Sequence, residues 1–357
     1  MKKLSISALA LAAMGIAPAA QAIEFEPTDN STFAVYGEVA PSLKSEKNGS
    51  GDWEFQYADE DSILGINGEH RITDEFQLYA SAEFLFFSDD STPSFEFDEG
   101  WFGIKGDSWG SIQAGGQENP FTYLINDNVN VAEIAEITGD DQLPPENNMF
   151  VYRSPNINGF SVAGKLRVLG EGDGVQGDVT QQDETEFDVG GVAGYSGENF
   201  TLRAAYTTVN TRTRTITSPT PVFGTDPQGN QVKVGTTGGT TGFTDGAHYG
   251  VTGDVSFGPA TIAAKVAEAS FDNATDLTRY AGTGILRYGQ FIDQGSGKLY
   301  GSVQQVERDN NNRDWTEITV GVDYKPIDNF KVYGEAGWFD RQNDEGDVIG
   351  VGAIYSF

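Results

Sequence analysis

Apolar and polar residues alternate along several stretches of this chain. In residues 76–86, FQLYASAEFLF, the even positions are apolar or aromatic, and the odd positions are polar apart from Leu85. Residues 200–206 (FTLRAAY) and 330–338 (FKVYGEAGW) repeat the pattern. A period of two residues is typical of a β-strand that has an apolar environment on one face and a polar one on the other. No 3.6-residue period is sustained after residue 22, so the alternation predicts an all-β fold.

Two kinds of connection separate the alternating stretches. Short polar turns, each followed by Phe as the first strand residue, occur at 73–76, 156–160, 197–200 and 327–330. Turns of this kind form hairpins between antiparallel strands. The other strand ends are joined by longer, mostly acidic segments, at 44–60, 88–94, 118–147, 171–184 and 211–244. This asymmetry predicts an up-and-down barrel with short turns at one end and long loops at the other.

The alternation and the turns together predict a single domain over residues 23–357. It has sixteen expected strands, near 32–43, 61–72, 76–87, 95–106, 111–117, 148–155, 160–170, 185–197, 200–210, 246–258, 260–272, 275–290, 297–309, 315–326, 330–341 and 347–357. A barrel of sixteen strands encloses a lumen too wide for side chains to fill. The polar face, which carries Glu83, Arg203, Lys331 and Glu335, must then surround water while the apolar face meets lipid. A soluble β-sandwich or β-helix would also alternate and is the alternative fold.

Both ends of the chain carry signals. Residues 1–22 combine Lys2 and Lys3, an apolar stretch and the small-residue triplet Ala20-Gln21-Ala22, which is the layout of a secretory signal peptide. At the other end, apolar or aromatic residues alternate up to Tyr355 and Phe357. We expect this last strand to close the barrel against the first, with its aromatic side chains at the membrane interface.

The composition narrows the function classes. The chain has 22 Lys and Arg against 53 Asp and Glu, a formal net charge of −31, so nucleic acid and anionic lipid are poor partners. Cys is absent, which excludes disulfides and thiolate chemistry, and only His70 and His248 could act as histidine bases or ligands. No EF-hand pattern is present, and we predict no metal site and no cofactor.

The sequence with these features resembles the general porins of Gram-negative outer membranes. The most specific stretches are residues 101–121 (WFGIKGDSWGSIQAGGQENPF), residues 147–166 (NNMFVYRSPNINGFSVAGKL) and the terminal Phe357, which is similar to the family's assembly signal. The resemblance implies an outer-membrane homotrimer of sixteen-stranded barrels, with the short turns in the periplasm and the long loops outside. It also implies passage of small hydrophilic solutes and ions.

The resemblance further implies that the third long loop, about 118–147, folds into the barrel and narrows it. We expect Ile134 and Ile137 to pack on the wall. The candidate constriction residues are acidic: Asp127, Glu133, Glu136, Asp140, Asp141 and Glu146. The alternative is that these carboxylates only solvate an extracellular loop.

The chain departs from the family where a cluster of wall arginines is expected. The matching positions hold Ile63, Asp98, Gly116 and Pro145, none of which is basic. Only Arg153 matches a basic position of the family. The candidate basic residues of the pore wall are Arg71, Arg153, Lys165, Arg167 and Arg203, with Lys265 and Arg279 as further candidates. The sequence therefore predicts a cation-selective pore.

Three other functions compete with that of a general channel. An outer-membrane hydrolase needs a nucleophile with a histidine base, and no such motif surrounds either histidine. A porin specialised for one substrate, or a surface-binding protein that uses loop 211–244, would also fit the alternation. A channel without enzymatic activity is the prediction.

Overall fold

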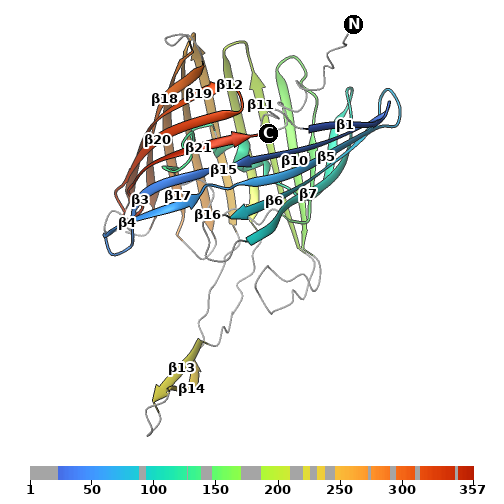
Figure 1. The fold of residues 1–357 in the computed structure, drawn as a ribbon. Coiled ribbons are helices and arrows are strands. Elements are labelled where there is room, and N and C mark those ends of the chain that lie inside the picture. The colour runs from blue at the N-terminus through green and yellow to red at the C-terminus, as the bar shows by residue number, and fades with distance from the viewer. Residues whose placement is uncertain are drawn as a thin grey trace.

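The computed structural model describes residues 23–87, 94–126, 128–137, 147–169, 186–209, 220–225, 231–237, 246–271, 275–289, 295–309, 314–341 and 345–357. The strands form a closed antiparallel barrel, which Figure 1 shows from the side. The all-β class predicted from the alternation is confirmed. Residues 1–22 lie outside the described residues, so the signal peptide stays a prediction. No helix in the described ranges is long and apolar enough to cross a membrane.

Sixteen wall strands make up the barrel, as the sequence predicts. The first is formed by β2 (Ser31–Val39) and β3 (Pro41–Lys47), and the second by β4 (Trp53–Asp59) and β5 (Ile63–Arg71). The others are β6 (Gln77–Phe87), β7 (Ser94–Gly106), β8 (Gly110–Gly116), β9 (Met149–Arg153), β10 (Phe160–Leu169), β11 (Glu186–Ser196), β12 (Phe200–Val209), β15 (Gly246–Phe257), β16 (Ala260–Phe271), β17 (Leu277–Tyr288), β18 (Ser296–Arg308), β19 (Trp315–Ile327), β20 (Phe330–Phe339) and β21 (Val348–Ser356).

The last strand closes the barrel where the sequence predicts. Val351 of β21 pairs with Leu43 of β3, and Tyr355 pairs with Val39 of β2. The row of hydrogen bonds between β2 and β21 ends with the Gly37 amide, which donates a hydrogen bond to the Phe357 carbonyl over 2.9 Å.

Two features of this region were not predicted. An additional strand, β1 (Ile23–Thr28), pairs with the part of β2 that lies beyond the end of β21, with Ile23 opposite Val35. It covers backbone groups that would otherwise form an open edge in the wall. The segment 44–60, predicted as a loop, instead holds the end of β3 and all of β4.

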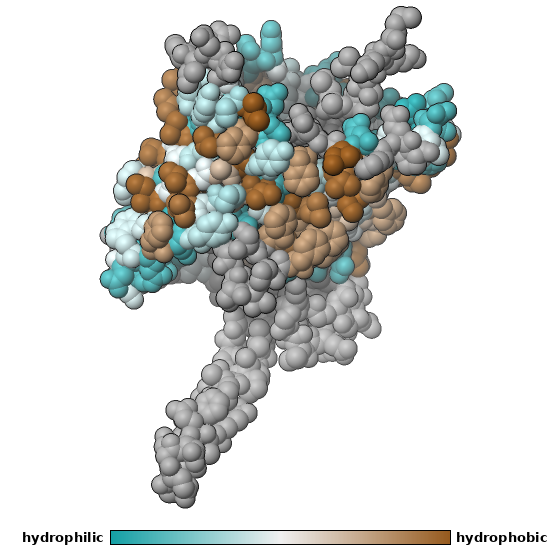
Figure 2. Space-filling view, viewed as in Figure 1, coloured by the Kyte–Doolittle hydropathy of each residue, from teal (hydrophilic) through white to brown (hydrophobic). Residues whose placement is uncertain are grey.

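The apolar faces of the strands point outward. Phe55, Phe102, Leu202 and Val266 are among many large apolar side chains that are exposed, and they occupy alternate positions along their strands. In Figure 2 brown and tan residues spread across the face of the barrel. An exposed apolar surface of this extent suits contact with lipid hydrocarbon and not with water.

Within the long segment 211–244, β13 (Thr220–Thr225) and β14 (Gln231–Thr237) pair as a separate antiparallel hairpin. Figure 1 shows the two strands well away from the barrel wall. A hairpin outside the wall is consistent with the prediction that residues 211–244 form a long connection between two wall strands. The alternative of a surface-binding loop stays a prediction.

Tyrosine rings inside the barrel lie flat over glycines of the neighbouring strand. Tyr36 is paired with Gly65, and a Cβ atom added at Gly65 would stand 2.0 Å from the Tyr36 Cζ atom. The same arrangement recurs for Tyr79 over Gly103, Tyr300 over Gly321 and Tyr333 over Gly352. The glycines are therefore required for close approach of a ring to the backbone.

We expect Gly65→Ala to destabilise the barrel by about 1–3 kcal/mol, because the methyl group forces the Tyr36 ring out of its position. Gly68 lies on the same strand with nothing within 4 Å of an added Cβ, so Gly68→Ala is the matched control. Urea unfolding of both variants in lipid vesicles measures the difference. Equal stability of the two variants would show that the Tyr36 ring adapts without cost.

Candidate functional site

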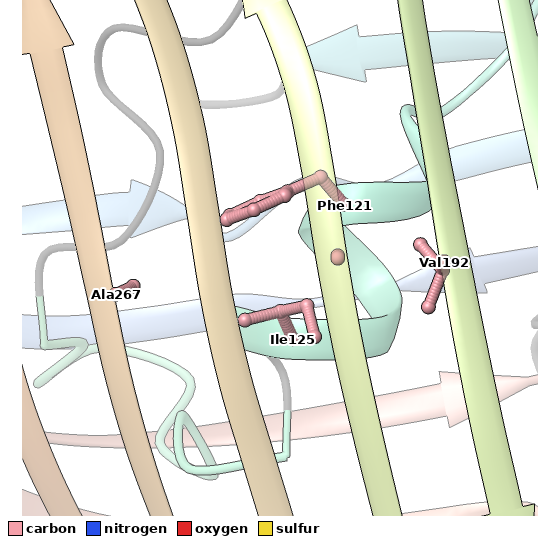
Figure 3. Close-up of a cluster of buried hydrophobic side chains, with 5 residues drawn as sticks. Phe121, Ile125, Val192 and Ala267 are labelled. Atoms are coloured by element: carbon pink, nitrogen blue, oxygen red, sulfur yellow. The ribbon is translucent and has the colours of Figure 1, made fainter.

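The loop that follows β8 turns into the barrel instead of leaving it. Its first part contains a short π-helical turn, η2 (Thr122–Asn126), which lies inside the wall. Phe121 and Ile125 project from this part onto Val192, Ala205 and Ala267 of the wall. Figure 3 shows Phe121 and Ile125 projecting from the coil of the loop toward the strands that carry Val192 and Ala267. Burial of this apolar cluster holds the beginning of the loop against β11, β12 and β16.

Polar contacts hold the middle of the loop. The Val129 carbonyl accepts hydrogen bonds from the hydroxyls of Thr283 (2.5 Å) and Ser302 (2.9 Å). Lys265 Nζ donates to Asn126 Oδ1 over 3.1 Å. Because these wall residues touch an internal loop, their side of each strand is the lumen side. This agrees with the polar face predicted to surround water.

Glu335 of β20 fastens the tip of the loop. Its carboxylate accepts hydrogen bonds from the backbone amides of Glu133, Ile134 and Ala135 over 2.7 to 3.1 Å. It also accepts one from the Tyr300 hydroxyl. Three consecutive amides aimed at one carboxylate form a strong anchor, since hydrogen bonds to a charged acceptor are stronger than neutral ones. The lumen-facing position of Glu335 was predicted from the alternation of β20, whereas its contact with the loop was not.

The two isoleucines of the loop pack on the wall as expected. Ile137 is buried with Val129 and wall alanines, and Ile134 packs against a cluster formed by Ala40, Tyr333 and Ile354. The predicted fold of the third loop into the pore is thus seen over residues 117–126 and 128–137.

The acidic candidates of this loop differ in environment. Glu133 forms an ion pair with Lys331 of β20. Glu136 is exposed, and its carboxylate accepts a hydrogen bond from Asn130 Nδ2 over 3.0 Å. The pairing of Glu133 with Lys331 was not predicted from the sequence. The other four candidates, Asp127, Asp140, Asp141 and Glu146, lie outside the described residues, and their place at the constriction stays a prediction.

The five basic wall candidates all lie on the lumen side of their strands by register. Arg71 is exposed beside the turn after β5, and Arg153 and Arg203 are half-buried. Lys165 and Arg167 are buried. Arg167 forms an ion pair with Asp188 over 3.0 Å and also donates to Asn147, so the guanidinium is engaged by the protein.

Acidic residues occupy the wall from the end of β4 to β7. Asp61, Glu83 and Asp98 form a connected group, since Asp98 lies within electrostatic reach of both Asp61 and Glu83. None of the three forms an ion pair within the described residues. We call these residues the wall triad. The sequence indicates that Asp98 stands at a position where an arginine is expected, but the proximity of Asp98 to Asp61 and Glu83 could not be predicted from it.

The two histidines lie on opposite faces. His70 is on the outer face near the short turns, with Nδ1 2.8 Å from the Ser31 hydroxyl. His248 is buried on the lumen face, where its ring meets Phe121 of the loop and Phe271 of β16 edge-on. The described residues hold no group of three or more His, Asp or Glu side chains arranged to bind a metal ion.

The geometry agrees with what comparisons with known proteins show. A family model described as Gram-negative porin matches residues 7–344. A protein of Halomonas sp named monosaccharide porin is 26% identical over 395 residues, and the match covers 100% of both chains.

Solved structures share the fold at low sequence identity. OmpF of Salmonella typhi, solved in complex with daunomycin, has a TM-score of 0.67 at 15% identity and covers 94% of this chain and 100% of its own. The trimer form of OmpT from Vibrio cholerae has a TM-score of 0.61 at 17% identity, with coverage of 92% and 100%.

Proposed function

The chain belongs to the Gram-negative porin family and forms its barrel in the outer membrane, and on that premise we propose that it is a passive diffusion channel that prefers cations. Small hydrophilic solutes and ions cross through the water-filled lumen, past the constriction made by the inward loop. The family membership favours a channel over an enzyme.

One observation carries the proposed selectivity: the three carboxylates of the wall triad lie together on the lumen face, and Asp98 stands at a position where the sequence resemblance implies an arginine. Lys44 is the basic residue recorded within reach of Asp61, and its Nζ atom already pairs with Glu60 over 2.9 Å. Unpaired carboxylates in a pore with low-dielectric walls attract cations and repel anions. A potential worth about 1.4 kcal/mol at the constriction changes the local ion concentration about tenfold.

Planar-bilayer recording tests this selectivity. With a tenfold KCl gradient, we expect a reversal potential close to the potassium equilibrium value, because K⁺ enters the constriction more readily than Cl⁻. The variant Asp61→Asn/Asp98→Asn should move the reversal potential toward zero. A chloride-selective pore would disprove the proposal.

A second candidate is a pore adapted to monosaccharides, which the name of the Halomonas relative suggests. The observation in its favour is the set of aromatic side chains on the lumen face, where sugar rings can stack. These are Tyr36, Tyr79, Tyr300, Tyr333 and Trp101, of which Trp101 lies edge-on to Tyr79 at 5.2 Å.

A monosaccharide-adapted pore would show saturable block of the ion current by one sugar at millimolar concentration, and Trp101→Ala would weaken that block. A general pore would show only size-dependent reduction of the current, with no difference between stereoisomers. We expect the second result, because four of the five rings are largely covered by neighbouring groups.

We also propose that the protein assembles as a homotrimer. The support is the trimer form recorded for the structurally similar OmpT. The exposed apolar surface of the barrel supplies area both for contact with neighbouring copies and for contact with outer-membrane lipid.

A further inference from the structure

An ion pair joins the tip of the inward loop to the wall. The Lys331 ammonium of β20 donates to the carboxylate of Glu133. Lys331 is the second residue of β20 and Glu335 is its sixth, so the pair lies on the side of the loop tip that faces the short turn between β19 and β20. The side chains of Lys331 and Glu133 are 14% and 30% exposed, and ions in the lumen therefore reach the pair.

Two further contacts hold the charges of this pair in position. The Glu335 carboxylate accepts hydrogen bonds from the Glu133 backbone amide, so the backbone at Glu133 is held at the wall independently of its own side chain. The Lys331 Nζ atom lies 5.6 Å from the centre of the Tyr333 ring, and the cation–π attraction favours this position of the ammonium group. Loss of either charge therefore leaves the other at the loop tip.

The two charges nearly cancel at the position of a passing ion. A carboxylate that lines a pore attracts cations and an ammonium group repels them, and the two effects are of similar size when the groups are in contact. Glu133 was predicted as a constriction carboxylate, but its ion pair with Lys331 leaves the loop tip with little net charge at this point. Each charge becomes effective once its partner is removed.

We propose that Lys331 is a selectivity-determining residue of the pore, because it cancels the charge of Glu133 and so limits the preference for cations at the loop tip. The proposal rests on the proposed cation-selective channel and names the residues of the constriction that set the degree of its preference. The wall triad then supplies a preference to which the loop tip adds little while the pair is intact.

Reversal potentials of the full chain in planar bilayers under a KCl gradient test this role. We expect Lys331→Met to raise the ratio of K⁺ to Cl⁻ permeability about threefold or more, because a carboxylate charge at the loop tip is no longer cancelled. Glu133→Gln should lower the ratio by a similar factor, because an ammonium charge is left there. The double variant Glu133→Gln/Lys331→Met should return to the wild-type ratio.

The opposite signs of the two shifts separate an effect of charge from a structural role. If the pair only fastened the loop, both single variants would lose the same contact. They would then change the conductance and the open-channel noise in the same direction, without opposite shifts of the reversal potential. That result would overturn the proposal, and so would a double variant that kept the shift of either single variant.

Lys105 of β7 provides a matched control on the wall. Its ammonium pairs with Glu69 over 2.5 Å, the two side chains are 15% and 23% exposed, and its Nζ atom lies 4.9 Å from the centre of the Tyr79 ring. Lys105→Met therefore leaves one carboxylate charge in a similar setting, but on the wall and not on the loop. We expect a smaller shift of the permeability ratio than in Lys331→Met. Equal shifts would show that the preference follows the total charge of the lumen, and the special role of the loop tip would be lost.

Failure of this inference is distinguishable from failure of the proposed function. A wild-type pore that prefers cations, but whose single variants do not shift in opposite directions, retains the proposed function and loses the role of Lys331. A wild-type pore that prefers chloride loses the proposed function, whatever the variants show. Conversion from the compact to the heat-unfolded band on SDS gels confirms that each variant is folded before it is recorded.

Discussion

Replacing Glu335 by Ala is expected to release the tip of the constriction loop and to give a channel with higher and noisier conductance. The carboxylate holds three consecutive loop amides and the Tyr300 hydroxyl. A hydrogen bond to a charged group contributes about 1.5–3 kcal/mol, and such contributions are not fully additive. If these hydrogen bonds together contribute about 4 kcal/mol, their loss raises the fraction of channels with the loop tip detached from the wall about a thousandfold.

Single-channel recordings measure both effects, as the mean conductance and as the open-channel noise. Asp254→Ala is the control, because Asp254 faces the lumen from β15 and makes no hydrogen bond or ion pair in the described residues. It removes one lumen charge without touching the anchor. If both variants showed the same conductance and noise, Glu335 would be a wall charge and not the fastening of the loop.

The faces of most wall strands could be predicted from the sequence. Glu83, Arg203, Lys331 and Glu335 all lie on the lumen side, because strict alternation determines the side of each residue once one face must meet lipid. The closure of the last strand on the first followed from the same reasoning.

The errors lie where the alternation changes phase. Trp53, Phe55 and Tyr57 alternate well, but the irregularity at residues 60–62 separates them from the outward residues of β5. One continuous alternating pattern therefore covers only the second half of this wall strand. The change of phase is itself readable in the sequence, and it marks two of the three wall carboxylates.

The contacts between loop and wall could not be predicted from the sequence. Glu335 and Glu133 are separated by 202 positions, and alternation states only that Glu335 points into the lumen. Which loop amides reach it depends on the path of the loop. For the same reason Lys331 was predicted as a lumen residue, whereas its pairing with Glu133 was not.

The largest loss of stability is expected from Arg167→Met. The guanidinium pairs with Asp188 over 3.0 Å in a setting where the two side chains are 3% and 0% exposed. Removal of one partner from a buried ion pair costs about 3–5 kcal/mol, because the remaining charge keeps its desolvation penalty without its counter-charge. The variant also loses the hydrogen bonds to Asn147, where the chain returns from the loop to β9.

A double-mutant cycle separates the ion pair from the loop contact. Arg167→Met/Asp188→Leu should recover most of the stability, since a buried ion pair can be replaced by apolar side chains at little cost. Lys298→Met is the control, because the Lys298–Asp323 pair is longer, at 3.5 Å, and Lys298 is 31% exposed. Its loss should cost about 1 kcal/mol or less. Urea unfolding in vesicles gives the free energy of unfolding of the wild type and of the three variants Arg167→Met, Arg167→Met/Asp188→Leu and Lys298→Met.

Single-channel conductance then tests the loop contact. If the double variant recovers its stability but its conductance still differs from that of the wild type, Arg167 also holds the end of the loop through Asn147. If Arg167→Met unfolded no more easily than Lys298→Met, the buried pair would contribute nothing measurable to the stability of the wall.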